Sequence, residues 1–399
     1  MQATSPRELD AELARHSAYG EPHRCIRERE SVHLFLLDVV SDVAPETCEL
    51  KNVLEALPGP QRSRVLRSPV FQATVNQLAR DMFGRQPTSP RAVGVLRRLI
   101  SVASDRQTGP VETSCGERLS GAAADAEVFI WRDDEDILST ELRTLFREQV
   151  LREGGTATID LRSPDGRMSK VLQAGAALLD EIVPELARSM FAHVSLVAIV
   201  DDVDPAYWST LDRKHLFESG SSDGLPAVLF LTPNAVVDEW VTAEALFHEA
   251  CHQKLFDLVK TKSIYRAQYS GNCAQRIPCL WRRTGGQPDP WITDRAFLGL
   301  HVYVYLALYY LILADDTDRV IRRSGLQRKG DSEEAFREAA DRAHYLARVL
   351  HDHSLVDLGD DGRRLLEWLR EQLERRIDGS TDFESVRERV SRDVSAVAS

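Results

Sequence analysis

Two histidines and a glutamate are the residues of this chain that are best suited to chemistry. His248, Glu249 and His252 form the motif H-E-x-x-H within residues 242–259, where apolar residues recur at the spacing of a helix. Residues four apart lie one turn above each other on the same helix face, so both imidazoles point the same way. Such a pair can hold two neighbouring positions of a first-row divalent metal ion, and the adjacent carboxylate can orient a bound water molecule or move its protons.

The same three residues also have a purely structural interpretation. From ordinary residue frequencies, a chance H-E-x-x-H occurs in roughly one chain in a hundred of this length, so the motif alone is a hypothesis. The expected helix is apolar on its other sides and should be buried, and buried imidazoles and carboxylates need partners. We therefore favour a metal site over a structural histidine pair.

The positions at which common zinc proteases place a third ligand hold other residues here. In the pattern H-E-x-x-H-x-x-G-x-x-H, the glycine and the third histidine are replaced by Leu255 and Leu258. A thermolysin-like site needs a glutamate on a following helix, but no glutamate occurs in residues 253–332. A metal bound by the motif must therefore take its third protein ligand from another kind of residue.

His301 is our candidate for that third ligand. It lies alone in the apolar stretch 296–314, and Asp294, two turns earlier, is positioned to accept a hydrogen bond from its second ring nitrogen. A lone histidine on an apolar face is more often a core residue, which is the alternative. Three neutral nitrogens with open positions suit Zn²⁺ or Fe(II). His193, which precedes an expected strand, is interpreted as a buried, hydrogen-bonded residue.

Arginines precede the candidate third ligand. Arg282 and Arg283 lie in residues 265–292, a stretch with Gly, Pro and Trp that we expect to form an ordered lid or pocket wall, and Arg295 follows it. Arginine binds carboxylates through paired hydrogen bonds, so these three are candidates to bind an anionic co-substrate. Surface ion pairs with nearby aspartates are the alternative.

The composition is typical of a soluble globular protein. Hydrophobic residues make up 43% of the chain and charged residues 28%, and the net charge of −12 argues against nucleic-acid and membrane-surface binding. Six cysteines without a C-x-x-C pair, and a polar start without a signal sequence, predict a cytoplasmic protein. Residues 296–314 nearly reach the length of a membrane span, but with His301 among them we expect a buried core helix.

The expected fold is mostly helical α+β, a helical bundle around a small central sheet with the metal site between two core helices. We expect an N-terminal helical region at 1–122 and an HExxH metal-binding domain at 123–399, or one continuous domain. Strands are expected at 126–131, 157–161, 194–200 and 227–231. The further helices are expected at 31–43, 50–57, 69–82, 91–104, 169–190 with a kink at Pro184, 333–350, 363–377 and 382–398.

The segments that carry the motif resemble a known family. The sequences AEALFHEACHQKLFDL (243–258) and DRAFLGLHVYVYLALYY (294–310), with a Trp- and Arg-bearing loop between them, are similar to the HExxH-motif family of peptide-modifying proteins. Flanking segments extend the resemblance over about residues 55–373. Members occur in clusters that make ribosomal peptide natural products, and some are Fe(II)- and α-ketoglutarate-dependent β-hydroxylases of peptide side chains.

This resemblance implies that His248, His252 and His301 bind iron and that α-ketoglutarate (2-oxoglutarate) takes the open positions. Glu249 would then handle protons or orient water. The loop WRRTGGQPDPWITDR departs from the family's W-R-x-D-P-R-P-like run, which leaves the arginine that binds the co-substrate undecided.

We therefore expect a non-haem iron, 2-oxoglutarate-dependent dioxygenase that hydroxylates a C–H, at the β-carbon, of a peptide or amino-acid substrate. A zinc hydrolase or peptidase with Glu249 as general base is the alternative. A third possibility is a non-catalytic protein that keeps the metal for structure.

Overall fold

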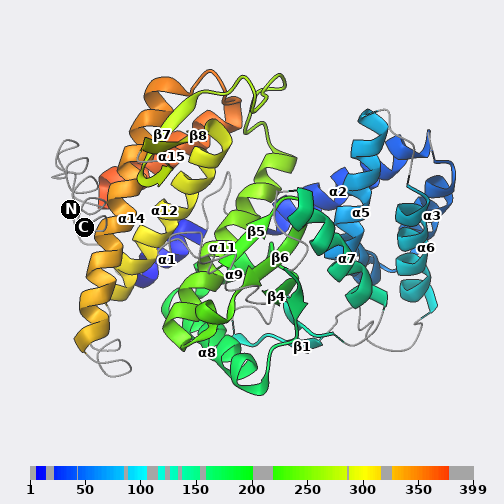
Figure 1. Ribbon diagram of the computed structural model, residues 1–399, viewed down its shortest axis with the longest axis horizontal. Coiled ribbons are helices and arrows are strands. Elements are labelled where there is room, and N and C mark those ends of the chain that lie inside the picture. The colour runs from blue at the N-terminus through cyan, green and yellow to red at the C-terminus, as the bar shows by residue number, and fades with distance from the viewer. Residues whose placement is uncertain are drawn as a thin grey trace. The chain divides into compact units, whose positions relative to one another are not determined.

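The computed structural model shows a chain that divides into two compact units (Figure 1). The larger unit is Leu13–Thr261, and the smaller unit joins Met1–Glu12 with Lys262–Ser399. The structure describes residues 6–14, 22–42, 44–84, 89–105, 116–121, 126–133, 137–152, 159–200, 219–284, 287–315 and 326–376. The helix expected at 382–398 lies outside these described residues.

A mixed sheet forms the centre of the larger unit. Its strand order is β1-β2-β4-β6-β5, and β3 pairs antiparallel with β4. The parallel strands β2, β4 and β6 are flanked by β1 and by β5, which is antiparallel to β6. All residues of β4 and β6 are buried, as continuous apolar runs in parallel strands require. The strands are β1 (Gly116–Arg118), β2 (Phe129–Trp131), β3 (Leu161–Arg162), β4 (Leu196–Val200), β5 (Ser219–Ser222) and β6 (Leu225–Leu231).

Helices make up most of the described part of this unit, which confirms the expected mostly helical α+β class. The expected helix 169–190 is divided at Pro184, because proline lacks the N–H that a continuous helix would use. The helices are α2 (Pro22–Ser41), α3 (Glu46–Ala56), α4 (Gly59–Arg67), α5 (Pro69–Phe83), α6 (Pro90–Asp105), α7 (Ile137–Arg152), α8 (Gly166–Ile182), α9 (Pro184–Phe191), the 3₁₀ helix η3 (Pro233–Val236) and α11 (Glu239–Thr261), while α1 (Pro6–Ala14) begins in the residues of the smaller unit.

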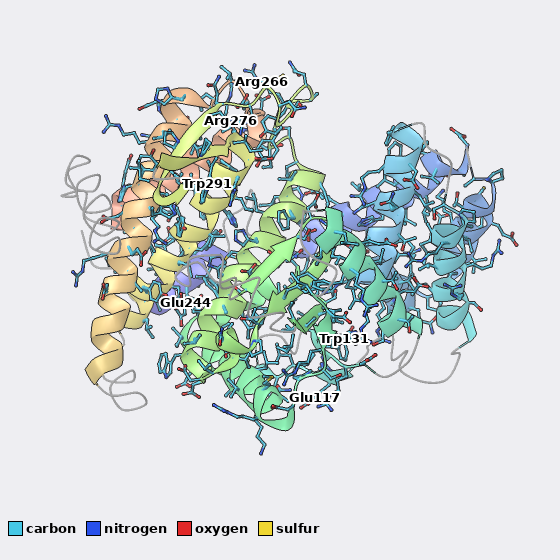
Figure 2. The ribbon with its side chains drawn as sticks, in the orientation of Figure 1. Glu117, Trp131, Glu244, Arg266, Arg276 and Trp291 are labelled. Carbon is cyan, nitrogen blue, oxygen red and sulfur yellow. The ribbon has the colours of Figure 1, made fainter. Side chains whose placement is uncertain are left out.

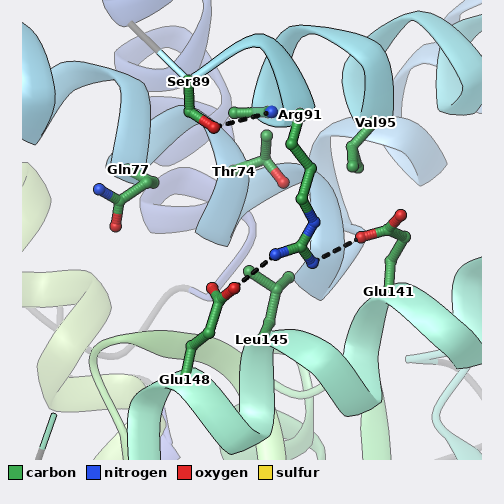
Figure 3. Close-up of a pocket in the computed structure, with 9 residues that line it drawn as sticks. Thr74, Gln77, Ser89, Arg91, Val95, Glu141, Leu145 and Glu148 are labelled. Carbon is green, nitrogen blue, oxygen red and sulfur yellow. Dashed lines mark hydrogen bonds and ion pairs between the residues drawn. The ribbon is translucent and has the colours of Figure 1, made fainter. Parts of the chain in front are cut away.

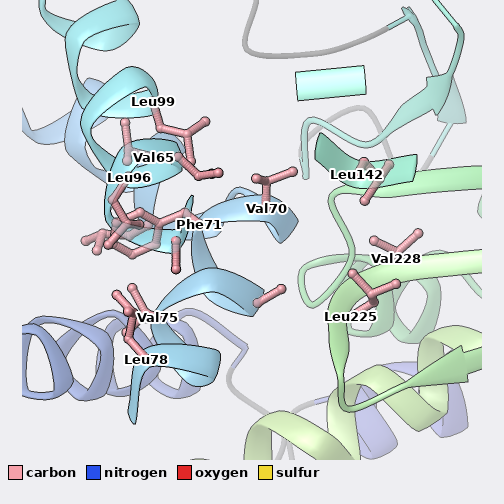
Figure 4. Packing of buried hydrophobic residues seen from close by; sticks show 14 of the residues in the cluster. Val65, Val70, Phe71, Val75, Leu78, Leu96, Leu99, Leu142, Leu225 and Val228 are labelled. Carbon is pink, nitrogen blue, oxygen red and sulfur yellow. The ribbon is translucent and has the colours of Figure 1, made fainter. Parts of the chain in front are cut away.

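One buried core joins the N-terminal helices to the sheet. Phe71 on α5, Leu96 on α6, Leu142 on α7 and Val228 on β6 belong to the same hydrophobic cluster (Figure 4). Burial of such side chains contributes about 1.5–3 kcal/mol each. The cluster therefore extends across residue 122, and the domain boundary expected there stays a prediction.

The smaller unit consists of a hairpin and long helices. The hairpin is β7 (Arg276–Thr284) and β8 (Gln287–Ile292), and the helices are α12 (Thr293–Asp315), α14 (Leu326–His353) and α15 (Asp360–Arg376). Trp281 packs edge-on against Trp291 of β8, Tyr303 of α12 and Tyr345 of α14, with ring centroids 5.7–5.8 Å apart. These contacts hold the hairpin on the helices, so the stretch 265–292 is ordered by aromatic packing.

Helix α12 carries the apolar stretch noted in the sequence. Residues Thr293–Leu313 are long and apolar enough to cross a membrane, and 78% of the most apolar window is buried inside the structure. Such burial is typical of a core helix. The cytoplasmic location stays a prediction.

Candidate metal centre

Helix α11 places the H-E-x-x-H residues. It begins after Asp238, whose Oδ1 accepts hydrogen bonds from the N–H groups of Trp240 and Val241, 2.8 and 2.9 Å away. Glu239 in the first turn and Lys260 in the last complement the helix dipole. Apolar residues on other faces, among them Leu246, Phe247, Ala250, Leu255 and Leu258, are buried. The expected helix 242–259 is confirmed and is longer at both ends.

The Nε2 atoms of His248 and His252, the two imidazoles on α11, lie close together. Nε2 of His248 lies 3.1 Å from Nε2 of His252, and the ring centroids are 4.9 Å apart. Two nitrogens bound to one ion at about 2.0–2.1 Å, at angles between a right angle and the tetrahedral value, are separated by about 2.9–3.4 Å. The pair therefore has the spacing of neighbouring ligands on one metal ion. Glu244 lies one turn before His248 on the same helix (Figure 2).

Glu249 sits beside the histidines but is less close. Its Oε1 lies 3.9 Å from His248 Nε2 and accepts a hydrogen bond of 2.7 Å from the hydroxyl of Ser219. The side chain is 3% exposed, and Oε2 is buried without a hydrogen-bond partner among the described residues. The possible ligand atoms of His248, Glu249 and His252 all lie within 4.8 Å of one another. At 3.9 Å, the carboxylate suits a water molecule on the ion better than direct coordination.

A second side chain of α11 attaches this face of the helix to the sheet. Gln253, one turn after Glu249, accepts from the N–H of Ala227 at 2.8 Å and donates to the carbonyl of Val228 at 3.0 Å. Ala227 has φ 61°, in the left-handed region that costs a non-glycine residue free energy. Since Gln253 satisfies the backbone there, it holds α11 beside β5 and β6 (Figure 1).

The candidate third ligand belongs to the smaller unit. His301 is buried on α12, and its ring centroid lies 4.9 Å from that of Tyr305. Asp294, its expected hydrogen-bond partner, accepts from the N–H of Arg295 at 2.6 Å, while its own N–H donates to the hydroxyl of Tyr269. The meeting of His301 with the histidines of α11 stays a prediction.

The candidate co-substrate arginines have different surroundings. Arg295 is exposed, and its guanidinium lies over the ring of Trp291, 5.0 Å from the centroid. This cation–π contact keeps the positive charge at the surface of the hairpin. The side chains of Arg282 and Arg283 lie outside the described residues. The binding of an anion by these arginines stays a prediction.

A separate buried network surrounds Asp257 on the same helix. Its Oδ2 accepts from Arg29 Nη1 at 2.5 Å and lies 2.7 Å from His193 Nδ1. This confirms that His193 is buried and hydrogen-bonded. Lys254, also buried, donates to the hydroxyl of Ser189 at 2.9 Å, and burial lowers the pKa of Lys254 to about 8. The network joins α11 to α2 and α9, which the sequence did not indicate, because its members are far apart in the chain.

One surface pocket of about 230 Å³ lies between α5, α6 and α7 (Figure 3). Arg91 extends across it and pairs with Glu141 and Glu148, and Arg98 also pairs with Glu141. The four side chains balance each other in charge, and none belongs to the H-E-x-x-H group. The pocket therefore adds nothing to the chemistry of the candidate metal centre.

No protein-family model matches the chain, and no curated protein matches it either. The resemblance to the HExxH-motif family therefore stays a prediction that depends on the segments around His248 and His301.

Proposed function

We propose that this protein is a metal-dependent oxygenase that uses Fe(II) and 2-oxoglutarate to hydroxylate a C–H of a peptide or amino acid, at the β-carbon. In the overall reaction, the substrate C–H, O₂ and 2-oxoglutarate give the C–OH product, succinate and CO₂. The observation that carries the metal centre is the 3.1 Å separation of the His248 and His252 Nε2 atoms beside the buried Glu249. Bound iron and 2-oxoglutarate would supply the oxidising chemistry.

The residues of the chain have distinct parts in this proposal. His248 and His252 hold two neighbouring positions of the ion, and His301 is the proposed third ligand, which would place the site between α11 and α12. Glu249 accepts a hydrogen bond from water at the ion and orients it. Arg295, with Arg282 and Arg283, is the proposed source of the cation that binds the distal carboxylate of 2-oxoglutarate.

Two features of the sequence support an oxygenase over a protease. In the pattern H-E-x-x-H-x-x-G-x-x-H, Leu255 and Leu258 replace the glycine and the third histidine. A thermolysin-like site needs a later glutamate as third ligand, and residues 253–332 contain no glutamate. The resemblance to peptide β-hydroxylases points to the same conclusion.

A zinc hydrolase is the second candidate, and the surroundings of Glu249 favour it specifically. Oε1 is held by Ser219 while Oε2 is buried without a hydrogen-bond partner among the described residues. A carboxylate fixed in this way beside two metal ligands can serve as the general base for a metal-activated water.

Metal loading under controlled conditions tests the proposal. The protein is purified without oxygen and loaded separately with Fe(II) and with Zn²⁺. We expect one Fe(II) per chain, a visible charge-transfer band on addition of 2-oxoglutarate, and succinate release when O₂ and peptide are supplied. Zn²⁺-dependent peptide cleavage without succinate would establish the hydrolase instead. A protein that binds neither ion at the motif would overturn both functions.

The third ligand is tested separately. We expect His301→Ala to abolish the charge-transfer band while His353→Ala, which changes an exposed histidine, leaves it intact. Equal spectra for the two variants would remove His301 from the site.

A further inference from the structure

The Glu249 carboxylate has a described hydrogen-bond donor that the motif does not contain. Ser219, thirty residues earlier in β5, donates from Oγ to Glu249 Oε1 at 2.7 Å. We propose that Ser219 is a positioning residue for the metal centre: it donates to Oε1, the oxygen that lies 3.9 Å from His248 Nε2, and thereby fixes the carboxylate so that the second lone pair of Oε1 can accept a hydrogen bond from water at the ion. The inference rests on the proposed function, since it assumes a metal ion between His248 and His252.

The chemistry of the donor suits this role. A carboxylate can rotate about its last bond, and either oxygen could then face the ion. A hydroxyl that donates to Oε1 fixes the rotation but brings no positive charge, so it positions the carboxylate without forming an ion pair with it. An arginine or lysine in the same place would fix the carboxylate and neutralise it as well.

The fold sets the distance between Ser219 and Glu249 through the backbone. Ser219 pairs in register with Leu231 of β6, and Gln253 attaches α11 to β6 through its two hydrogen bonds. The strand and the helix are therefore both held to β6 independently of the Ser219 hydroxyl. Loss of that hydroxyl should leave the backbone in place and free only the carboxylate.

The same strand offers a matched control. Ser221, two residues further along β5, also has a buried hydroxyl, and that hydroxyl has no hydrogen-bond partner among the described residues. Ser221→Ala removes the same atoms from the same strand without touching Glu249. Ser219→Thr keeps a hydroxyl and is the conservative rescue variant.

The test uses the full-length protein with cobalt(II) as a spectroscopic probe and with Fe(II), 2-oxoglutarate and O₂ for turnover. We expect Ser219→Ala to alter the visible spectrum of bound cobalt in the same sense as Glu249→Gln and to lower succinate formation about tenfold, the effect typical of residues that orient a metal site. Ser221→Ala and Ser219→Thr should resemble the unmodified protein. In a Glu249→Gln background, Ser219→Ala should have no further effect, because the two residues act as one unit.

The outcomes separate this inference from the proposed function. If the protein binds cobalt and turns over, but Ser219→Ala behaves like Ser221→Ala, Ser219 has no positioning role and the proposed function stands. An additive effect of Ser219→Ala in the Glu249→Gln background would also overturn the inference. If the unmodified protein binds no metal at the motif, the proposed function and the inference both fail. Thermal unfolding of each variant shows whether a loss comes from unfolding instead.

Discussion

Helix α11 carries two buried carboxylates whose surroundings differ. Asp257 is 1% exposed and meets the guanidinium of Arg29 and the imidazole of His193. Burial alone would raise the pKa of Asp257, but Arg29 and His193 outweigh it and hold that pKa well below its usual range. Glu249, two turns earlier and 2% exposed, has a neutral hydroxyl donor on one oxygen and a second oxygen without a hydrogen-bond partner among the described residues.

This difference separates a structural carboxylate from a candidate functional one. A buried charge costs several kcal/mol unless an opposite charge and hydrogen bonds compensate it. For Asp257 the protein supplies that compensation itself, through residues on α2 and after α9. For Glu249 the described protein supplies one hydroxyl donor and, 3.9 Å from Oε1, the Nε2 atom of His248, so an incoming ion with its water is the partner that the arrangement favours.

The largest expected effect is the loss of a metal ligand. His248→Ala should weaken metal binding on the order of 1,000-fold or more, since each of three protein ligands contributes roughly a third of a typical zinc-site binding free energy of about 10–16 kcal/mol. Equilibrium competition with a chromophoric chelator measures this change. His351→Ala, which changes a half-exposed histidine of α14, is the control. Equal affinities for the two variants would contradict the assignment of the site to α11.

The next effect concerns the structural carboxylate. Asp257→Asn should lower the free energy of unfolding by about 3–5 kcal/mol, because it leaves Arg29 buried without its counter-charge. Urea denaturation followed by circular dichroism measures this change, and metal affinity should stay within about threefold once folded protein is compared. The double variant Arg29→Met with Asp257→Leu should recover part of the stability, since the ion pair is then replaced by apolar side chains while His193 loses its hydrogen-bond partner. If Asp257→Asn unfolds with the same free energy as the unmodified protein, Asp257 is not a structural carboxylate and the proposed difference from Glu249 is wrong.

The corresponding change at Glu249 should lower turnover and leave the free energy of unfolding nearly unchanged. Glu249→Gln replaces a buried carboxylate whose described hydrogen-bond donor is a neutral hydroxyl, so we expect the free energy of unfolding to stay within about 1 kcal/mol or to rise. Turnover should fall about 100-fold or more, as is typical when a residue that handles protons is lost. Steady-state assays and urea denaturation of the same preparation measure both quantities. A destabilisation as large as that of Asp257→Asn would show that Glu249 is structural too.

The smallest effect is a pH dependence centred on the buried imidazoles near Asp257. Burial, reinforced by the charges of Arg29 and Lys260, lowers the pKa of His33 to about 3. Below about pH 6.5 the His33 imidazole is protonated in the unfolded chain but stays neutral in the folded protein. The free energy of unfolding therefore falls as the pH decreases from about 6.5 towards 3. The slope for one such histidine is about 1.4 kcal/mol per pH unit. His33→Leu should reduce the measured slope of urea midpoints between pH 6 and 4.5, and an unchanged slope would contradict the shift.

Short-range features were predictable from the sequence. The helix spacing of the H-E-x-x-H residues, the buried strands β4 and β6 and the break at Pro184 all follow from local patterns of apolar residues and from proline chemistry. Strand β5 was missed because its residues, SGSS, lack the β-branched and aromatic side chains that indicate strands. We expected the hairpin β7–β8 only as an ordered stretch, because its three prolines and the register shift between Cys279 and Arg283 hide the alternation of a strand.

By itself the sequence determined that two imidazoles and a carboxylate share one turn of a buried helix, since helical periodicity acts over four residues. Only the tertiary structure decided which carboxylate on that helix is neutralised. Ser219 and Glu249 are 30 residues apart, and Arg29 and Asp257 are 228 apart. Such pairs form when strand register and helix packing bring distant segments together. Local sequence patterns span only a few residues and therefore do not predict these contacts.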